Sequence, residues 1–549
     1  MKQASILNVM LKFALVALTV VQVACSDSSS SSSSSGPADS SISGTIVAAP
    51  VNGAQVSVVD GNGNVVAGPV TTDGTGRYTL SIPNSSLAQD LIVVSSGGTF
   101  TDEATGNSGT AGEILAYAPA SSLSDGASAS ATPGSTVIAK LVMSHGKTLA
   151  QAKDIFTTAF GYAPDISVTP ADATTAPAAD ETDASTLAGF RAAVFSQLAM
   201  DLGLSQDEQF DLFAALAQDL SDGNLDGVDA SGAVAIGTTG KTLEADIQNR
   251  FAMAVVNFHD SANNLTALNN AQIGNLPFGK VALTDSYRID YVQMGMMDPM
   301  EGKSTFKLHI TDRVSGDNVT GKIPGLTVTM HMAEMSHSTP MPTPAVIEDI
   351  SNDGRYTVTL YYLMPSQMMD GMSMGYWDLK FTVAGEEAHF YPAVMMAMGD
   401  TAQVRLKGVN DKIMSMMTST MVSRTYFMFK DSLQCTMGVC DFSVFVAAQQ
   451  NMTSFPAVFV GSELSGKTVD DVIVEISDDD GVTWKPAADA GNGVWSVTGL
   501  SLTDGVQDAV RIRLSVDRDA VAEYKTTDGL EQNPGVNDYQ TFKVTPVGM

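Results

Sequence analysis

The spacing of apolar residues changes twice along this chain, and that pattern limits what it can fold into. Apolar and polar residues alternate over 42–130, apolar residues recur at helical spacing over 131–275, and alternation returns from 280 onward. A chain of 549 residues is also too long for one hydrophobic core. We therefore predict a multidomain, mainly β protein, with one all-α helical domain inserted between β-sandwich domains. The predicted domains are 42–130, 131–275, 280–430 and 431–549.

The first residues have the pattern of an export signal. Positive charge precedes a short apolar run, 13–24, which is too short for a comfortable membrane span. The run ends at Cys25, and residues 1–25 resemble the signal peptide of bacterial lipoproteins, whose cysteine is lipidated. The Ser-rich segment 26–41 has too few apolar residues for a core and is expected to be a flexible tether. The resemblance implies a lipid anchor in the bacterial cell envelope, facing the periplasm or the surface. Because Ser26 rather than Asp follows the cysteine, the outer membrane is favoured, and a cleaved ordinary signal peptide is the alternative.

The composition argues against several function classes. The 29 basic residues are outnumbered by 60 acidic ones, which argues against nucleic acid as a partner because phosphate binding needs clustered Lys and Arg. The pattern G-x-S-x-G occurs at 371–375 and the pattern G-x-x-x-x-G-K-T at 461–468, but neither lies between a predicted strand and a predicted helix, which is the context that a serine hydrolase or a nucleotide-binding loop requires. The sequence contains no zinc-protease signature and no C-x-x-C-H haem attachment motif. We therefore expect a non-enzymatic protein without nucleotide or haem.

Residues 42–130 are predicted to form a β-sandwich. Tyr78, Leu80 and Ile82 fall on one face of a predicted strand, and glycine-rich turns separate the alternating segments. The G-x-(I/V) start and the T-D-G-x-G-x-Y ending resemble the carboxypeptidase-regulatory-like β-sandwich. The resemblance implies a spacer module and no peptidase activity.

Helix signals dominate the next segment. A capping box at Thr148–Gln151 predicts a helix that ends at Gly161, and a longer helix is predicted over 183–202. A second capping box at Ser205–Glu208 and a final helix over 241–262 complete the predicted helical domain. This domain resembles a helical module of large bacterial lipoproteins.

An acidic turn in this domain follows the first half of a calcium-binding loop, D-x-N-x-D-G. Its candidate ligands are the side chains of Asp222, Asn224 and Asp226 and the main-chain carbonyl of Val228. The ninth and twelfth positions, Ala230 and Ala233, offer no side-chain oxygen. Calcium binding and a metal-free turn at the end of a helix both remain open.

Most of the 29 methionines, and four of the six histidines, lie between residues 294 and 452. Thioether and imidazole groups suit copper, whereas methionine also fills irregular gaps in cores and interfaces. Alternation places Met330 and Met332 on the apolar face of a strand and turns His331 away. Prolines at 340, 342 and 344 predict an extended loop without ladder hydrogen bonds, in which His337 is exposed.

A family resemblance rests on this region. The run M-H-M-x-x-M-x-H, the D-G-R-Y motif and a second Met-rich loop before Trp377 resemble the YtkA-like and FixH-like periplasmic β-sandwiches, which are similar to CopC-type domains. The resemblance implies copper binding. The residues that match the pattern are Met330, His331, Met332, Met335, His337, Met372 and Met374. The alternative is that the Met-rich loops form an apolar surface for a protein partner, in a structural or adhesive protein.

The C-terminal segment is predicted to be a further sandwich. Its V-x-x-S-x-D-x-G-x-T-W pattern resembles immunoglobulin-like or fibronectin-like modules of bacterial surface proteins, which implies a spacer or adhesive unit. Cys435 and Cys440 are spaced for one small-loop disulfide, which a secreted domain tolerates.

Overall fold

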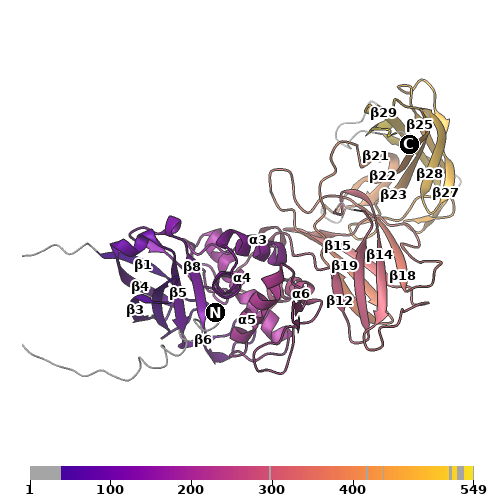
Figure 1. Cartoon of the computed structure of the whole chain (residues 1–549). Helices are drawn as coiled ribbons and strands as arrows, with labels where there is room; N and C mark the ends of the chain where they lie inside the picture. Colours follow the sequence, from indigo (N-terminus) through magenta and orange to yellow (C-terminus); the bar gives the residue numbers. More distant parts are fainter. Residues whose placement is uncertain are drawn as a thin grey trace, which may run out of the picture. The chain divides into compact units, whose positions relative to one another are not determined.

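The structure is a computed structural model that describes residues 39–295, 298–415, 418–436, 438–518, 522–527 and 537–547, with backbone alone at 522–527. The fold is mainly β and multidomain, as predicted (Figure 1). It divides into two compact units, and the border between them along the chain falls between Leu268 and Asn269. The signal peptide with Cys25, and the predicted tether up to residue 38, lie outside the described residues. Asp39–Ser41, predicted to be tether, already belong to the first strand.

The first unit begins with a β-sandwich of two sheets. One sheet contains β4 (Arg77–Pro83), β1 (Asp39–Thr45) and β9 (Ala127–Ser128), and the other β3 (Val65–Thr71), β2 (Gln55–Asp60), β5 (Leu91–Ser96) and β8 (Ile114–Ala118). A hairpin of β6 (Thr99–Thr101) and β7 (Ser108–Thr110) and two short turns, η1 (Asn84–Ala88) and η2 (Ala120–Ser122), complete it. Tyr78, Leu80 and Ile82 all point into the shared core, as their alternation predicts.

Five helices follow in the first unit: α2 (Pro133–Met143), α3 (Leu149–Phe160), α4 (Asp183–Asp201), α5 (Gln209–Asp219) and α6 (Ile247–His259). Between α5 and α6 lie the short turn η3 (Leu220–Asp222) and the hairpin of β10 (Val228–Asp229) and β11 (Gly232–Ala233). The first predicted capping box is confirmed, because the Thr148 side chain accepts from the Gln151 amide and Gln151 accepts from the Thr148 amide. The last helix is shorter than predicted, because the backbone pairing of Ala235 with Thr242 takes up the first part of 241–262.

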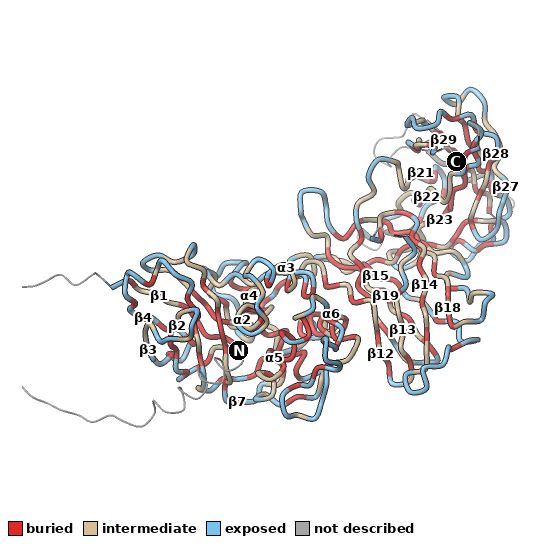
Figure 2. The backbone as a smooth tube through the Cα atoms, in the orientation of Figure 1, coloured by how far each residue is buried: buried red, intermediate tan, exposed pale blue. Residues whose placement is uncertain are grey.

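The helices and the sandwich share a hydrophobic interface. Helix α2 packs against β8, where Ala139 joins Leu115 and Ile92 in one buried cluster. The hydroxyl of Ser135 donates to the carbonyl of Leu115 at 2.6 Å, and the Leu115 amide donates to the hydroxyl of Thr136 at 2.9 Å. Figure 2 shows the buried residues continuing from the strands into the helices. The two predicted domains on either side of residue 130 therefore belong to one compact unit.

The second unit begins with a short helix, α7 (Asn270–Ile273), and a central sandwich. Its first sheet contains β12 (Val281–Leu283), β13 (Tyr287–Gln293), β14 (Gly302–Asp312), β18 (Arg355–Tyr362) and β17 (Val346–Glu348). Its second sheet contains β16 (Ser336–His337), β15 (Gly325–His331), β19 (Tyr376–Val383) and β20 (Glu386–Phe390). Phe306, Tyr356 and Trp377 are fully buried between the two sheets.

An 11-stranded sheet forms the rest of the second unit. Its strands are β21 (Gln403–Met414), β22 (Met421–Thr436), β23 (Val439–Ala448), β24 (Glu463–Leu464), β25 (Lys467–Ser477), β26 (Lys485–Pro486), β27 (Ala488–Gly491), β28 (Val494–Ser501), β29 (Asp508–Arg518), β30 (Ala522–Thr527) and β31 (Tyr539–Val544). Side chains from β22 and β23 meet side chains from β25 and β29 in one core. The predicted domain border at 430/431 falls inside β22, so this sandwich begins earlier, at β21. A disulfide joins Cys435 to Cys440 across β22 and β23.

No helix among the residues described from 39 onward is both long and apolar enough to cross a bilayer.

Candidate functional site

Two loops that the sequence singled out lie side by side at one end of the central sandwich. The proline-containing loop after β16 meets the end of β18, because the Tyr361 amide donates to the Pro340 carbonyl at 3.0 Å. The Leu363 amide donates to the hydroxyl of Thr339 at 3.2 Å, and the same hydroxyl donates to the Tyr361 carbonyl. Residues that follow β18 therefore lie beside those that follow β16.

His337 differs from the sequence prediction. It is buried, with 7% of its surface exposed, and it belongs to β16, which pairs with β15. His337 lies opposite Met330 in this pairing, and Met330 faces the core. Cross-strand partners project to the same side of a sheet, so His337 also points inward. The prediction that His337 is exposed was wrong, because His337 pairs with Met330 and its side chain points into the core. The strand that carries it is only two residues long and stops before Pro340, so the alternation of the sequence does not reveal it.

The ring of His337 is held by one hydrogen bond and faces a sulfur atom. Its Nδ1 lies 2.7 Å from the main-chain oxygen of Ser338. A carbonyl oxygen can only accept, so Nδ1 carries the ring proton. Its Nε2 lies 3.3 Å from the Sδ atom of Met364. Burial is the main influence on the pKa of His337 and lowers it, which favours the neutral ring. In that neutral ring, Nε2 presents a lone pair to the thioether.

Trp377 completes this corner of the sandwich. Its indole Nε1 donates to the main-chain oxygen of Met364 at 3.2 Å and so restrains the backbone there. The rings of Trp377 and His337 are 5.6 Å apart and almost perpendicular. Trp377 is fully buried, whereas the Met364 side chain is partly exposed at the edge of the core. The pair formed by His337 and Met364, which we call the His–Met pair, therefore joins a buried histidine to a partly exposed methionine.

The remaining residues of the predicted copper set are distributed around this end of the sandwich. Met330 is fully buried core, while Met332 and Met374 pack against the same core and are partly exposed. Met335 is half-buried in a turn, where its carbonyl accepts from the Met332 amide at 2.9 Å. Met372 lies on the second loop and is 57% exposed.

His331 takes no part in the His–Met pair. Its ring stacks on Tyr376, with centroids 4.9 Å apart. Its neighbour Met330 points into the core, so strand alternation turns His331 to the opposite face, as predicted. The sequence prediction thus included His337 but missed Met364. The available signal was the position of Met364, which comes soon after the last residue of β18.

Several methionines are exposed on loops at this end of the central sandwich. Met369, Met395 and Met398 expose 81%, 56% and 78% of their surface. The loops that carry them adjoin, because the Ser366 amide donates to the Val394 carbonyl at 2.8 Å. Exposed thioethers on two adjoining loops are available to a ligand or to another protein.

The second half of the predicted calcium loop does not have the geometry of a calcium-binding loop. The carboxylates of Asp222 and Asp226 are exposed and accept from the amides of Asn224 and Val228 at 2.9 and 3.3 Å. From Val228 onward the chain forms the hairpin of β10 and β11, in which Val228 pairs with Ala233. The hairpin takes the place of the second half of a calcium loop, which accounts for the missing ligands at its ninth and twelfth positions.

Asp219, which the sequence analysis missed, lies under this turn. It is fully buried, and its Oδ2 accepts from the Gly227 amide at 3.0 Å. Its Oδ1 is buried with no hydrogen-bond partner among the described residues. Burial, together with the charges of Asp226 and Asp222, raises the pKa of Asp219 to about 7. Asp219 could have been noticed as an acidic residue one helical turn before Asp222.

The described residues contain no ready-made group of three or more His, Cys, Asp or Glu side chains that could hold a metal ion. Because methionine is not one of these four residue types, this absence concerns the carboxylate turn and not the His–Met pair. Any cation at the turn must therefore draw the exposed carboxylates toward Asp219.

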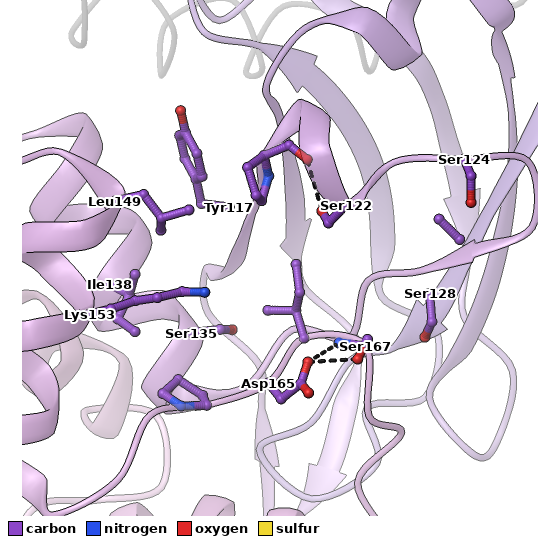
Figure 3. A pocket seen from close by; sticks show the side chains of 14 residues that line it. Tyr117, Ser122, Ser124, Ser128, Ser135, Ile138, Leu149, Lys153, Asp165 and Ser167 are labelled. Carbon is purple, nitrogen blue, oxygen red and sulfur yellow. Dashed lines mark hydrogen bonds between the residues drawn. The ribbon is translucent and has the colours of Figure 1, made fainter.

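A cavity of about 240 Å³ lies in the first unit between β8, α2 and α3 (Figure 3). Its polar lining is largely engaged within the protein. Ser135 donates to Leu115, Ser122 donates to Pro119, and the Tyr117 hydroxyl donates to Asp90. The Asp165 carboxylate accepts from both the amide and the hydroxyl of Ser167. These contacts are all made within the first unit, and Lys153 adds a cationic side chain to the lining.

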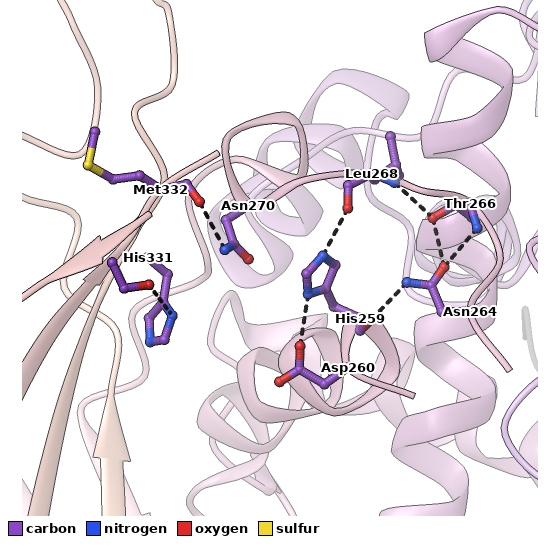
Figure 4. A network of polar contacts seen from close by, with 9 residues as sticks. His259, Asp260, Asn264, Thr266, Leu268, Asn270, His331 and Met332 are labelled. Atoms are coloured by element: carbon purple, nitrogen blue, oxygen red, sulfur yellow. Dashed lines mark hydrogen bonds and ion pairs between the residues drawn. The ribbon is translucent and has the colours of Figure 1, made fainter. Parts of the chain in front are cut away.

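Three other histidines, His259, His309 and His389, have structural partners. The ring nitrogens of His259 lie 3.1 Å from the Asp260 carboxylate and 2.9 Å from the Leu268 carbonyl, which ties the end of α6 to the following loop (Figure 4). In the second unit, Asn270 donates to the Met332 carbonyl at 3.1 Å, His309 contacts Asn318, and His389 contacts Asp378. None of these arrangements resembles a nucleophile with its base.

Comparisons with known proteins give little further guidance. No protein-family model and no curated protein matches the chain. The solved titin domains Z1Z2 in complex with telethonin align over 49% of this chain and 100% of that chain, at 12% identity and a TM-score of 0.12. Domains 4–9 of the surface layer protein SbsC align over 49% of this chain and 32% of that chain, at 13% identity and a TM-score of 0.14. TM-scores this low carry no argument about fold or function.

Proposed function

We propose that this chain is a non-enzymatic, lipid-anchored protein of the bacterial cell envelope whose central sandwich binds copper(I) at His337 and Met364. The observation that carries the proposal is the orientation of His337. Its Nδ1 proton is used by the Ser338 carbonyl, so the free lone pair of Nε2 faces the Met364 sulfur at 3.3 Å. Two electron-pair donors that face each other across a short distance suit a bound cation.

The chemistry of the two donors selects a soft ion. Thioether sulfur is a soft ligand and imidazole suits copper, whereas calcium and magnesium prefer oxygen. At a tetrahedral zinc, bonds of about 2.0 Å to imidazole nitrogen and about 2.3 Å to thiolate sulfur put the two donor atoms about 3.5 Å apart, and Nε2 and Sδ lie 3.3 Å apart. The separation of Nε2 and Sδ is therefore already suitable for sharing one ion. Met332 and Met374 belong to the sequence-predicted set and pack against the same core, so we expect them to provide further thioether ligands.

The fold also fixes the orientation of the His337 ring. Metal-binding histidines commonly donate their other ring proton to a carbonyl or carboxylate, which fixes the tautomer. The contact between His337 and the Ser338 carbonyl is of this kind. Trp377 restrains the backbone of Met364 by its hydrogen bond, so both donors are oriented before any ion arrives.

Anaerobic competition for copper(I) on the full chain tests the proposal. The wild-type protein should take up copper(I) at a defined stoichiometry, and Met364→Leu should weaken that binding at least tenfold because leucine keeps the volume but removes the sulfur. Met421→Leu is the matched control, since Met421 is half-exposed in β22, outside the core that contains the His–Met pair. Absence of stoichiometric binding, or equal binding by the Met364 variant, would contradict the proposal.

The exposed methionines favour a second candidate function, a structural or adhesive protein that docks a partner through these loops. Met369 and Met398 expose most of their surface on adjoining loops, and exposed apolar side chains that adjoin are typical of surfaces that bind a partner. In this case Met369→Glu should abolish crosslinking to an envelope partner, and a copper chelator should leave the crosslink unchanged.

A further inference from the structure

We infer that the turn after α5 is a calcium site, in which Asp219, Asp222, Asn224 and Asp226 supply the side-chain ligands. This site lies in the first unit and is independent of the proposed copper site in the second. Asp219 lies outside the incomplete sequence motif and adds a carboxylate to it.

The side chain of Asp219 is buried next to the turn. Asp219 is fully buried, and its Oδ2 accepts a hydrogen bond from the Gly227 amide, so the carboxylate contacts the turn. The Oδ1 atom has no hydrogen-bond partner among the described residues. A buried carboxylate oxygen without a partner is costly, and a bound ion is one of the standard ways in which proteins satisfy such an atom.

The exposed face of the turn provides further oxygen donors. Asp222, Asn224 and Asp226 occupy alternate positions and are exposed, and an arriving ion would compete with the amide contacts that Asp222 and Asp226 make. Gly223 and Gly227 both have positive φ, at 107° and 83°, which lets the turn close tightly over Asp219. A Cβ at Gly227 would also lie 2.7 Å from the backbone of Glu244, so glycine is required there.

Asp219 explains how the loop can dispense with the usual acidic residue at its twelfth position. Ala233 pairs with Val228 in the hairpin of β10 and β11, but alanine has no side-chain oxygen, so it supplies no carboxylate. Asp219, the last residue of α5, supplies a carboxylate in its place. Calcium tolerates six to eight oxygens in flexible geometry, whereas magnesium demands a near-ideal octahedron, so this mobile set of donors favours calcium.

A bound ion would tie the C-terminal end of α5 to the hairpin that follows. The Gly227 carbonyl accepts from the Val234 amide, and Val234 in turn accepts from the Leu243 amide, so the turn connects directly to the segment before α6. Calcium would therefore make the helical part of the first unit more resistant to unfolding.

Calorimetric titration and thermal unfolding of the chelator-treated full chain test the inference, with calcium chloride as the probe and magnesium chloride as a comparison. Wild-type protein should bind one calcium at this site and unfold several degrees higher with calcium, while magnesium gives a smaller shift. Asp219→Asn keeps an acceptor for the Gly227 amide but removes the charge, and it should weaken binding at least tenfold.

Two further variants keep the outcome clear. Asp226→Asn changes an exposed residue that does not threaten the core, and it should also weaken calcium binding at least tenfold. Asp60→Asn is the control, because Asp60 also caps amides in an exposed turn of the first unit but lies outside the site. Absence of a calcium effect on the wild type, or an effect that survives both Asp219→Asn and Asp226→Asn, would overturn the inference.

Discussion

Glu103 makes the stability of the first unit depend on pH. Its side chain is 2% exposed and connects three parts of that unit. The Ala49 amide donates to its Oε1 at 2.6 Å, and the Ser196 hydroxyl donates to its Oε2 at 2.7 Å. Burial is the largest influence on its pKa and raises it from 4.5 to about 7, against the opposing effect of the Ser196 hydrogen bond.

The direction of the pH dependence follows from which state, folded or unfolded, holds the Glu103 proton. Between pH 4.5 and about 7 the folded protein holds the Glu103 proton and the unfolded chain releases it. The contribution to stability is therefore fully present below pH 4.5 and is lost as the pH rises through about 7. Each pKa unit corresponds to about 1.4 kcal/mol, so the loss from this one group is about 3 kcal/mol.

Glu103→Gln should remove this part of the pH dependence, because glutamine keeps the shape and never ionises. Urea unfolding between pH 4.5 and 8, followed by helical circular dichroism, is a suitable assay because helices α2 to α6 all lie in the first unit. The free energy of unfolding should fall less steeply with pH in the variant than in the wild type, by about 3 kcal/mol over the range.

A matched control and a second titrating group sharpen the result. Glu181→Gln replaces an exposed glutamate of the same unit and should leave the pH dependence unchanged. Asp219, whose pKa is also raised to about 7, contributes with the same sign in both proteins and so does not affect their difference. Equal pH slopes for wild type and Glu103→Gln would refute the assignment of a buried, proton-holding Glu103.

Two other changes give measurable outcomes. Asp411→Asn should destabilise the C-terminal sandwich by about 3–5 kcal/mol, because buried Arg424 and Arg518 both bind the Asp411 carboxylate and would lose their counter-charge. Urea unfolding followed by tryptophan fluorescence reports this, since all 3 tryptophans lie in the second unit, and an unchanged midpoint would contradict it. Cys25→Ser should release the proposed lipoprotein from the membrane fraction into the soluble fraction of the envelope, whereas retention in the membrane would argue against lipidation.

Local rules predicted much of the fold. The capping box at Thr148 and Gln151 needs only residues three apart, and both of its hydrogen bonds form. The inward faces of β4 and β15 follow from alternation, which is also local. The final helix of the first unit begins at Ile247 and not at Lys241, because Ala235 pairs with Thr242 and this pairing competes with helix formation.

The candidate sites depended more on contacts between distant residues. His337 was predicted to be exposed because Pro340 follows it, yet its pairing with Met330 buries it. Met364 lies 27 positions from His337, and no motif spacing connects them. Asp219 falls outside the calcium motif and gains its meaning only because the Gly227 amide folds back onto it.

The sequence by itself determined the mainly β class, the order of the β and helical segments, the strand faces and the types of donor atoms available, because these depend on neighbours within a few residues. The tertiary structure alone decided that the first sandwich and the helices share a core, that the last sandwich begins at β21, and which donors face each other. Strand pairing and packing join residues far apart in the chain, so a two-residue strand can turn a histidine from solvent to a sulfur atom.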